Sequence, residues 1–574
     1  MNSFGRKAED GDWDRVKWVD LGKLAKNPDL REYLKELTQI IDMKFKNRAI
    51  TYFGRLAMLF VATGYAVHLN AQRFPASQVQ KLDPVVEKIV KEAKDNSELE
   101  QLAFELLDVV GPRLVGTPQM THANEWALRT FQRWGIPAKN QQFGEWHGWE
   151  RGISHIDMTH PRLKTLAGTQ LAWSPTTKGK AIEAEVIALP AFRDSIAFRA
   201  WLPNVKGKYV MVSMPQPSGR PDWNWKEYGT PESIAKMNKQ RDSIGASWNN
   251  RIKATGLAPN SIPSVLEDAG AVGILSSYWS GEFGANKIFG ARSHKAPSLD
   301  ISLEDYGILY RLAEKGYAPR IKVETSSKHL GNVPSFNTIA EIKGSEFPDE
   351  YVILSAHLDS WEGGSGATDN GTGTIAMMEV ARVLKQVLPN PKRTILIGLW
   401  GSEEQGLNGS RSFVLDNPEV IEKTQAVFNL DNGTGRVANI NGSGFVHSYD
   451  FMGRWLEAVP IEITKDIKTQ FPGSPGGGGS DHASFVAAGV PGFMLSSLSW
   501  GYFSNTWHTN LDTYDKLVFD DLLSNVILTA VLTYKASEEP KLVDREKRVL
   551  PKDANGQDAV WPAIRQPRRS GVGY

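Results

Sequence analysis

Short apolar runs, separated by turns and by one amphipathic segment, dominate the second half of the sequence. Residues 351–356, 394–400 and 426–430 are each almost wholly apolar. Between the first two, residues 373–387 carry apolar positions at helical spacing, among them Ile375, Met378, Val380 and Leu384. Continuous apolar strands are typical of a sheet covered on both faces. For residues 331–540 the pattern therefore predicts an α/β fold in which a mixed sheet is sandwiched by helices.

The first half of the chain has a different pattern. Residues 73–150 show apolar positions three to four apart, and we expect them to be mostly helical, so that 73–164 form the N-terminal part of the same fold. Between 165 and 330, short apolar runs alternate with turns, which predicts an inserted β-rich module; 216–260 are expected to form a long loop with some helix. The tail, 541–574, is rich in charge and proline and is expected to lie on the surface or to be partly disordered.

A targeting segment is predicted inside the sequence. A basic stretch begins at Met43, residues 56–67 form an apolar run, and Ala71 offers a small residue for cleavage. This layout is typical of a secretory signal peptide, and the run is shorter than the ~20 apolar residues that span a membrane. We therefore predict a signal peptide at 43–71 and a secreted or periplasmic protein without a stable membrane span, and we interpret residues 1–42 as a non-native or misassigned extension. A buried helix or an uncleaved anchor is the alternative.

Composition limits the partners and the chemistry. Lysine and arginine number 66 against 65 aspartates and glutamates, so the net charge of +1 gives no electrostatic case for nucleic acid or an anionic membrane as partner. There is no cysteine, which excludes thiolate metal sites, cysteine nucleophiles and disulfides. Any metal must be held by histidine and carboxylate groups.

Ionisable residues follow each apolar strand. In open α/β sheets, ligands bind outside the carboxyl ends of the strands, and charges gathered there are costly unless something neutralises them. A divalent metal would do so, and five ligands can serve two metals if one carboxylate bridges them. A carboxylate beside a ligand is then free to take a proton from water, and the adjacent Glu403 and Glu404 fit this division of roles. The residues directly after the three runs are His357, Asp359, Glu403, Glu404 and Asp431. Asp369 comes beyond a glycine-rich loop that follows the first run, and His508 follows a later apolar segment, 492–498.

Taken together, these stretches resemble the zinc exopeptidases of metallopeptidase family 28, and within it the carboxypeptidase Q (plasma glutamate carboxypeptidase) group. The resemblance covers about residues 85–540. It rests on His357-Leu-Asp-Ser-Trp, Thr-Asp369-Asn-Gly, Glu403-Glu404-Gln-Gly, Asn-Leu-Asp431, Ser480-Asp481-His482 and Trp-His508-Thr-Asn-Leu-Asp512. It implies the zinc-exopeptidase fold and identifies 165–330 as a protease-associated domain that acts as a lid or recruits substrate.

The resemblance also implies a role for each residue. Asp369 would bridge two zinc ions, with Glu404 and His508 completing one site and His357 and Asp431 the other. Glu403 would be the general base. Asp359 would orient the imidazole of His357, and Asp512 would play a similar supporting role near His508. Because every candidate ligand lies beyond residue 350, the ligands are expected to form without the insert.

The sequence leaves several alternatives open. Some family members carry a tyrosine before Ser-Asp-His, whereas residues 476–479 are all glycine here, so Tyr502 and His482 remain the candidates for the oxyanion donor. The predicted function is a two-zinc exopeptidase acting on dipeptides or short peptides. Whether it recognises the amino or the carboxyl terminus of the peptide is left open. A single-zinc glutaminyl cyclase is the alternative, and a non-catalytic receptor of the same fold is a third. Whether the chain forms a homodimer is left open.

Overall fold

The computed structural model describes residues 80–476, 478–552 and 556–571. The chain divides by its internal contacts into two units, Met1–Gln80 and Lys81–Tyr574, and the account below concerns the second. The predicted extension at 1–42 and signal peptide at 43–71 lie outside the described residues. Within the described ranges, no helix is long and apolar enough to cross a membrane.

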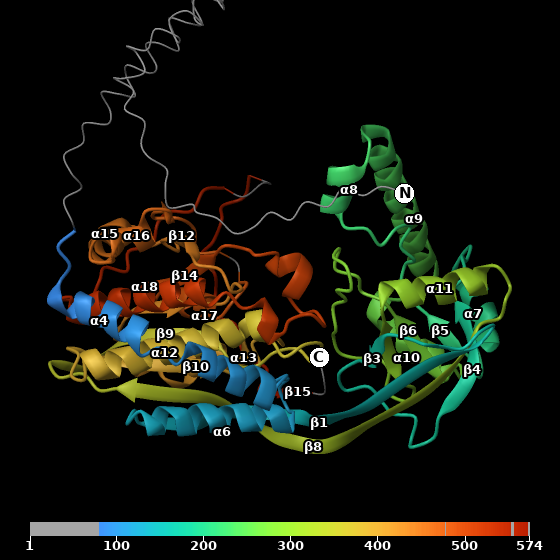
Figure 1. Ribbon diagram of the computed structural model, residues 1–574, viewed down its shortest axis with the longest axis horizontal. Helices are drawn as coiled ribbons and strands as arrows, with labels where there is room; N and C mark the ends of the chain where they lie inside the picture. Colours follow the sequence, from blue (N-terminus) through green and yellow to red (C-terminus); the bar gives the residue numbers. More distant parts are fainter. Residues whose placement is uncertain (1–79, 477, 553–555, 572–574) are drawn as a thin grey trace, which may run out of the picture. The chain divides into compact units, whose positions relative to one another are not determined.

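The second unit is built around a mixed sheet of 15 strands (Figure 1). The apolar runs seen in the sequence form its centre, where β9 (Phe347–His357) lies between two parallel neighbours, β10 (Arg393–Trp400) and β11 (Thr424–Asn429). Parallel strands buried on both faces need near-continuous apolar side chains, which these runs supply. The predicted mixed α/β fold is therefore confirmed. Outward from the centre lie β14 (Gly492–Ser497), β12 (Val437–Asn441) and β13 (Lys468–Gln470) on one side and β8 (Arg320–Ile342) on the other.

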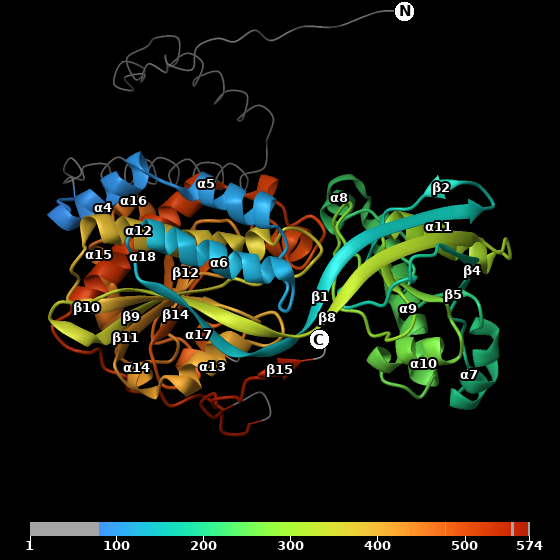
Figure 2. The ribbon, with the colours of Figure 1, turned by 90° about the horizontal axis from the view of Figure 1, so that it is seen from below.

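Helices cover both faces of this part of the sheet (Figure 2). One face carries the helices that pack into the largest apolar cluster, and the other carries three short helices. The first group is α4 (Pro84–Asp95), α5 (Leu99–Ala103), the π-helical η1 (Phe104–Val110), α6 (Pro118–Arg133), α12 (Thr372–Val387), α15 (Ser448–Glu457), α16 (Ile461–Thr464) and α18 (Phe519–Glu538). The second group is α13 (Asn408–Asp416), α14 (Pro418–Glu422) and α17 (His482–Ala487).

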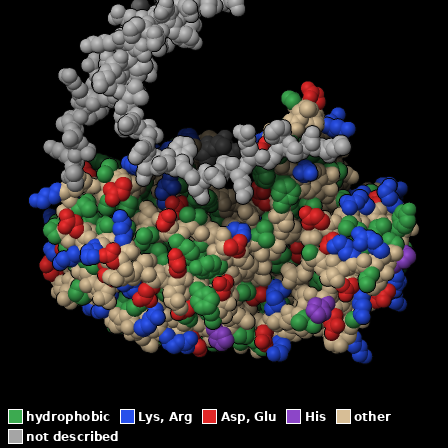
Figure 3. Space-filling view, viewed as in Figure 1, with side chains coloured by type: hydrophobic (Ala, Val, Ile, Leu, Met, Phe, Trp, Pro, Cys, Tyr) green, Lys and Arg blue, Asp and Glu red, His purple; other side chains and the backbone are tan. Residues whose placement is uncertain are grey.

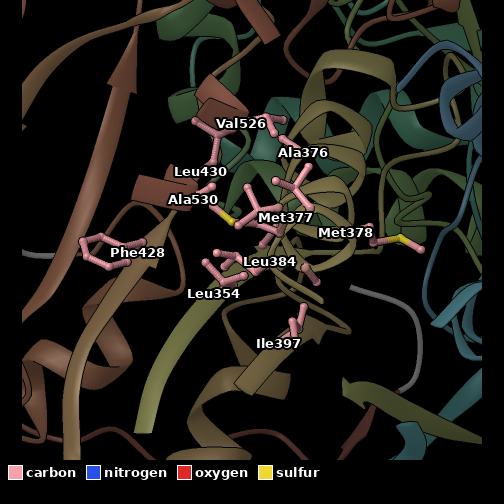
Figure 4. Packing of buried hydrophobic residues seen from close by; sticks show 14 of the residues in the cluster. Leu354, Ala376, Met377, Met378, Leu384, Ile397, Phe428, Leu430, Val526 and Ala530 are labelled. Atoms are coloured by element: carbon pink, nitrogen blue, oxygen red, sulfur yellow. The ribbon is translucent and has the colours of Figure 1, made fainter. Parts of the chain in front are cut away.

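Helix α12 is buried along nearly its whole length because most of its residues are apolar and its buried charges, Glu379 and Arg382, form an ion pair. Figure 4 shows Met377 and Leu384 of α12 near Leu354 of β9, with Ala530 of α18 close by. Each of these Met and Leu side chains contributes about 1.5–3 kcal/mol on burial. This packing fixes the start of α12, and with it the short segment η4 (Ala367–Gly371), at the carboxyl end of β9.

Two long strands continue the sheet into a smaller lobe. β1 (Ala138–His160) and β8 are 23 residues each and pair antiparallel from Ala138↔Ala340 to His160↔Arg320. The smaller lobe adds strands β2 (Lys164–Thr165), β3 (Gly168–Gln170), β4 (Ile182–Ala188), β5 (Tyr209–Met211), β6 (Gly273–Ser276) and β7 (Ser298–Ile301). Its helices are α7 (Ser195–Trp201), η2 (Leu202–Val205), α8 (Asp222–Tyr228), α9 (Pro231–Ala254), η3 (Pro259–Ser261), α10 (Ile262–Asp268) and α11 (Leu303–Glu314).

The smaller lobe differs from the sequence prediction in three respects. It is a mixture of helices and short strands rather than β-rich, and α9 replaces much of the long loop expected at 216–260. Of its 24 residues only Met237 and Trp248 are buried, so α9 has no apolar stripe to reveal it. β1 begins at Ala138, within the stretch expected to be mostly helical, and the predicted boundary at 330 falls inside β8. The identification of this lobe as a protease-associated domain stays a prediction.

The C-terminal segment follows the surface of the larger lobe and is fixed to it at several points. The indole N–H of Trp561 donates to the carbonyl of Val486 at 3.0 Å, and Arg569 forms an ion pair with Asp416. The last described residues of the segment form β15 (Ser570–Gly571), which pairs with β1. On the face shown in Figure 3, basic and acidic side chains are interspersed, in line with their nearly equal totals.

Candidate metal centre

The five candidate ligands come together at one edge of the sheet, as the strand-end pattern predicts. His357 is the last residue of β9, and Glu404 lies in the turn after β10. Asp431 follows β11, and Asp369 lies in η4. His508 comes after the π-helical segment η5 (Tyr502–Thr506). Parallel neighbours carry their carboxyl ends to the same edge, which is why residues so distant in sequence meet there.

Two groups of ligand atoms share Asp369. Nε2 of His357 lies 3.4 Å from Oδ1 of Asp369 and 3.1 Å from Oδ1 of Asp431. Nε2 of His508 lies 3.2 Å from Oδ2 of Asp369 and 2.9 Å from Oε2 of Glu404. In each group the ligand atoms all lie within 4.8 Å of one another. Asp369 therefore presents one oxygen to each histidine–carboxylate pair, the arrangement that a bridging carboxylate requires.

Buried atoms without hydrogen bonds show that this residue set fits metal ions. Oδ2 of Asp369, Oε1 of Glu404 and Nδ1 of His508 are buried and have no hydrogen-bond partner. Burial works to lower the pKa of His508, but Glu404 and Asp369 outweigh it and raise that pKa to about 10. Burial raises the pKa of Glu404 to about 7. Such shifts are typical of charges gathered in a low-dielectric site, and the nitrogen and oxygen donors suit zinc.

Asp359 and Asp512 hold main-chain groups next to the ligands. Their contacts differ from those that the sequence predicts. Nδ1 of His357 donates to the main-chain carbonyl of Asp359 at 2.9 Å, whereas the nearer carboxylate oxygen of Asp359 is 3.7 Å away. The Asp359 carboxylate instead accepts the main-chain N–H groups of Glu403 and Glu404 at 3.0 and 3.2 Å. Asp512 accepts the N–H groups of Thr368 and Asp369, so it orients Asp369 rather than His508.

Glu403 belongs to neither ligand group, although it adjoins Glu404. Burial raises the pKa of Glu403 well above its ordinary value, and His357 works in the opposite direction. Asp481, whose two carboxylate oxygens are buried without a partner, also raises it. A carboxyl group with a raised pKa is suited to accept and return a proton near neutral pH.

The two candidate oxyanion donors lie beside the cluster, Tyr502 buried and His482 partly buried. Burial lowers the pKa of His482 to about 4, which keeps its imidazole neutral, and raises the pKa of Tyr502 well above its ordinary range, which keeps its phenol protonated. Each can therefore donate a hydrogen bond. The negative charge of Asp431 raises the pKa of both residues, so both lie close to the ligand groups.

The smaller lobe supports His508 directly, which sequence reasoning missed. The N–H of Ile288 donates to the carbonyl of His508 at 2.9 Å, and Asn286 exchanges hydrogen bonds with Asn510. In the same loop, Nζ of Lys287 lies 3.7 Å from the centre of the Trp507 ring, which stacks on the His508 ring. His508 has a left-handed φ of 61°, which residues other than glycine adopt infrequently and which these contacts help to hold. The expectation that the ligands form without the insert stays a prediction, although these contacts link the insert to one of them.

Arg113 is a second residue that sequence reasoning missed. Its side chain is fully buried and donates to the carbonyls of Leu358, Ser365 and Gly366. These bonds fix the loop between His357 and Asp369. Asp512 and Asp359 act to raise the pKa of Arg113 against the effect of burial, so the guanidinium also offsets negative charge near the cluster.

Comparison with known proteins identifies the family. Residues 337–531 match the model of peptidase family M28, and every member of the two ligand groups lies within that stretch. Carboxypeptidase Q from Mus musculus is 27% identical over 510 residues, which cover 87% of this chain and 100% of that protein. Residues 337–531 therefore form an M28 peptidase domain. As the sequence motifs indicated, its relatives place it with the carboxypeptidase Q group, so it is a peptidase.

Solved structures show the fold of this M28 peptidase. An M28 peptidase precursor from Shewanella amazonensis SB2B superposes with a TM-score of 0.59 at 24% identity, over 82% of this chain and 98% of that one. BSAP, a zinc aminopeptidase from Bacillus subtilis, superposes with a TM-score of 0.51 at 19% identity, over 79% of this chain and 97% of that one. The sheet and its helices are thus those of M28 peptidases.

Proposed function

We propose that this M28 peptidase is a co-catalytic two-zinc exopeptidase that hydrolyses dipeptides or short peptides. The single observation that carries the proposal is the position of Asp369, whose two oxygens face two different histidine–carboxylate pairs. His357 and Asp431 would hold one ion, and Glu404 and His508 the other. The names of its relatives, carboxypeptidase Q and a zinc aminopeptidase, support metal-dependent exopeptidase chemistry.

The residues of the chain divide the reaction between them. When bound, two zinc ions would polarise the scissile carbonyl and lower the pKa of the attacking water. Glu403, outside both ligand groups, takes the proton of that water and passes it to the leaving amine. Tyr502 and His482 are neutral donors available for the oxyanion. The Asp359 carboxylate keeps Glu403 in place by accepting a hydrogen bond from the main-chain N–H of Glu403.

The two alternatives predict different results. A glutaminyl cyclase needs one metal ion and releases ammonia from an N-terminal glutamine, whereas a receptor of this fold would have lost ligands. Both groups here are complete, which favours two ions.

The test combines a metal count with an assay. We expect purified enzyme to contain about two zinc ions per chain, to hydrolyse free dipeptides, and to lose activity when a chelator removes the metal. One zinc ion per chain with ammonia release from glutaminyl peptides would establish the cyclase instead. Full peptidase activity in metal-free protein would refute both.

A further inference from the structure

A pocket of about 640 Å³ lies beside the middle of the β1–β8 pair. Its other walls are the segment between β3 and β4 and the segment between β6 and β7. Pockets of about 300–1,000 Å³ hold small organic ligands, so the volume suits one such molecule. None of the lining residues belongs to the two metal-ligand groups, so this pocket is a site apart from the candidate metal centre.

The ionisable part of the lining is wholly basic. Its members are Lys178, Lys295, His147, His294 and His329, and the described lining residues include no aspartate or glutamate. Lys295 is paired with Asp268, whereas no ion pair in the described part of the chain involves Lys178. An ammonium group without a carboxylate partner attracts anions, and lysine binds phosphate and sulfate oxygens as a point charge. The lining therefore favours a negatively charged ligand.

Two of the histidines form a hydrogen-bonded pair between β1 and β8. Nε2 of His147 lies 2.9 Å from Nδ1 of His329, so one ring donates to the other. The ring that accepts this bond keeps an N–H on its second nitrogen, and in the described part of the chain neither second nitrogen has a partner. Burial and the neighbouring His147 lower the pKa of His329, which keeps this ring neutral near pH 7. The pair therefore retains one N–H that can donate to a ligand.

The surroundings of this pair favour an anion over a metal ion. Zinc sites use about three or four protein ligands. Within the described residues, no third histidine or carboxylate completes a ligand group with His147 and His329. The ammonium groups of Lys178 and Lys295 would also repel a cation.

Hydrogen bonds fix two walls of the pocket. The carboxylate of Glu267 accepts the three consecutive N–H groups of residues 294–296 at distances from 2.7 to 3.0 Å. The indole N–H of Trp173 donates to the carbonyl of His147 at 3.1 Å. A pocket that is already in place loses little conformational freedom when a ligand binds.

The apolar part of the lining indicates that the anion is attached to an organic group. It consists of Trp173, Pro175 and Ala291. A free sulfate or phosphate ion would leave this surface in contact with water, whereas the organic group of an ester can cover it.

We propose that this pocket binds a small organic molecule that carries a sulfate or phosphate group. Lys178 and the His147–His329 pair contact the anionic oxygens, and Trp173 with its apolar neighbours contacts the organic group. The site is additional to the metal centre and does not depend on the proposed two-zinc mechanism.

Calorimetric titration of zinc-loaded, full-length enzyme with phenyl sulfate tests the proposal. We expect phenyl sulfate to bind and phenol, which lacks the anion, to bind far more weakly. Lys178→Gln and His329→Gln should each weaken the binding of phenyl sulfate by about 10- to 100-fold, because each removes a hydrogen bond to a charged group. Lys178→Arg should keep most of the affinity, since it keeps the positive charge.

Lys315→Gln and His155→Gln, which alter exposed residues outside the pocket, are the matched controls. Both should bind phenyl sulfate as the wild type does. All the variants should keep the thermal stability, the zinc content and the dipeptide hydrolysis of the wild type, because the altered residues lie outside the metal centre.

Titration with inorganic sulfate distinguishes an ester from a free ion. Inorganic sulfate should bind more weakly than phenyl sulfate, and equal affinity would overturn the assignment to an ester. Failure of phenyl sulfate to bind, or equal binding by the wild type, Lys178→Gln and His329→Gln, would overturn the proposal while leaving the peptidase function intact. Zinc bound in excess of the metal centre and lost in His329→Gln would overturn it in favour of a metal site.

Discussion

Asp512 holds the main chain of Asp369 in place from behind. Its Oδ2 accepts the N–H of Asp369 at 3.0 Å, and its Oδ1 accepts that of Thr368 at 2.7 Å. Supporting groups of this kind typically change metal affinity by 10- to 100-fold when they are lost. Asp512→Ala should therefore weaken zinc binding by about that factor, measured by competition with a chromogenic chelator. Asp515→Ala, which removes an exposed carboxylate three residues later, is the control; equal loss in both would contradict the role given to Asp512.

Glu403 and Glu404 should respond differently to the same substitution. Glu403→Gln keeps the shape of the side chain but removes the basic oxygen, so we expect it to retain zinc and lose about 10²–10⁴-fold in kcat. Glu404→Gln should lose zinc as well as rate, because Glu404 belongs to a ligand group. Metal analysis alongside single-turnover rates separates the two. A fully active Glu403→Gln enzyme together with a zinc-replete Glu404→Gln enzyme would reverse the assignment.

The contact between the smaller lobe and His508 should be measurable through Asn510. Its Oδ1 accepts the N–H of Asn286 at 2.7 Å, and its Nδ2 donates to the carbonyl of Gly284 at 3.0 Å. Asn510→Ala should loosen the His508 segment, so that one of the two zinc ions is lost at a lower chelator concentration than in the wild type. Asn505→Ala in the same segment is the control. Unchanged metal retention in Asn510→Ala would show that the loop does not position His508.

The buried carboxyl group of Asp300 should make stability depend on pH. Burial raises its pKa from 3.8 to about 8, although Asn286 and the N–H of Tyr278 donate hydrogen bonds to it. The folded chain then holds this proton more tightly than the unfolded chain. Stability should therefore fall as the pH rises from about 4 to 8 and should change no further above the folded pKa. Asp300→Asn should flatten this dependence in thermal unfolding; an unchanged slope would show that Asp300 does not ionise in this range.

The sequence could predict the metal cluster because the rule behind it is simple. Parallel strands such as β9, β10 and β11 bring their carboxyl ends to one edge, so a charged residue after each apolar run is enough to indicate a site. Asp369 and His508 needed the family motif as well, since neither directly follows a strand of this set.

Other features could not be predicted because they depend on contacts between distant segments. The N–H of Ile288 meets the carbonyl of His508 across more than 200 residues, and no local pattern marks either partner. Arg565 lies in a tail whose composition predicted only a surface position, yet it lines the same pocket as Arg411 of α13. The apolar pattern does not predict helix α9, because most of its residues are exposed and it has no apolar stripe. Thr230 and Pro231 do form a usual helix start, and the Thr230 side chain accepts a hydrogen bond from the N–H of Ser233.

The pairing of β1 with β8 has a consequence for how the chain folds. The two strands form one very long hairpin, and the whole smaller lobe stands in the position of its turn. Bringing the ends of an unstructured loop of that length together costs conformational entropy, which a preformed lobe reduces. We therefore expect the smaller lobe to fold first and to nucleate this hairpin. A substitution in its own core, at Leu299 for example, should then slow the assembly of the metal-binding sheet, although Leu299 packs in a separate apolar cluster.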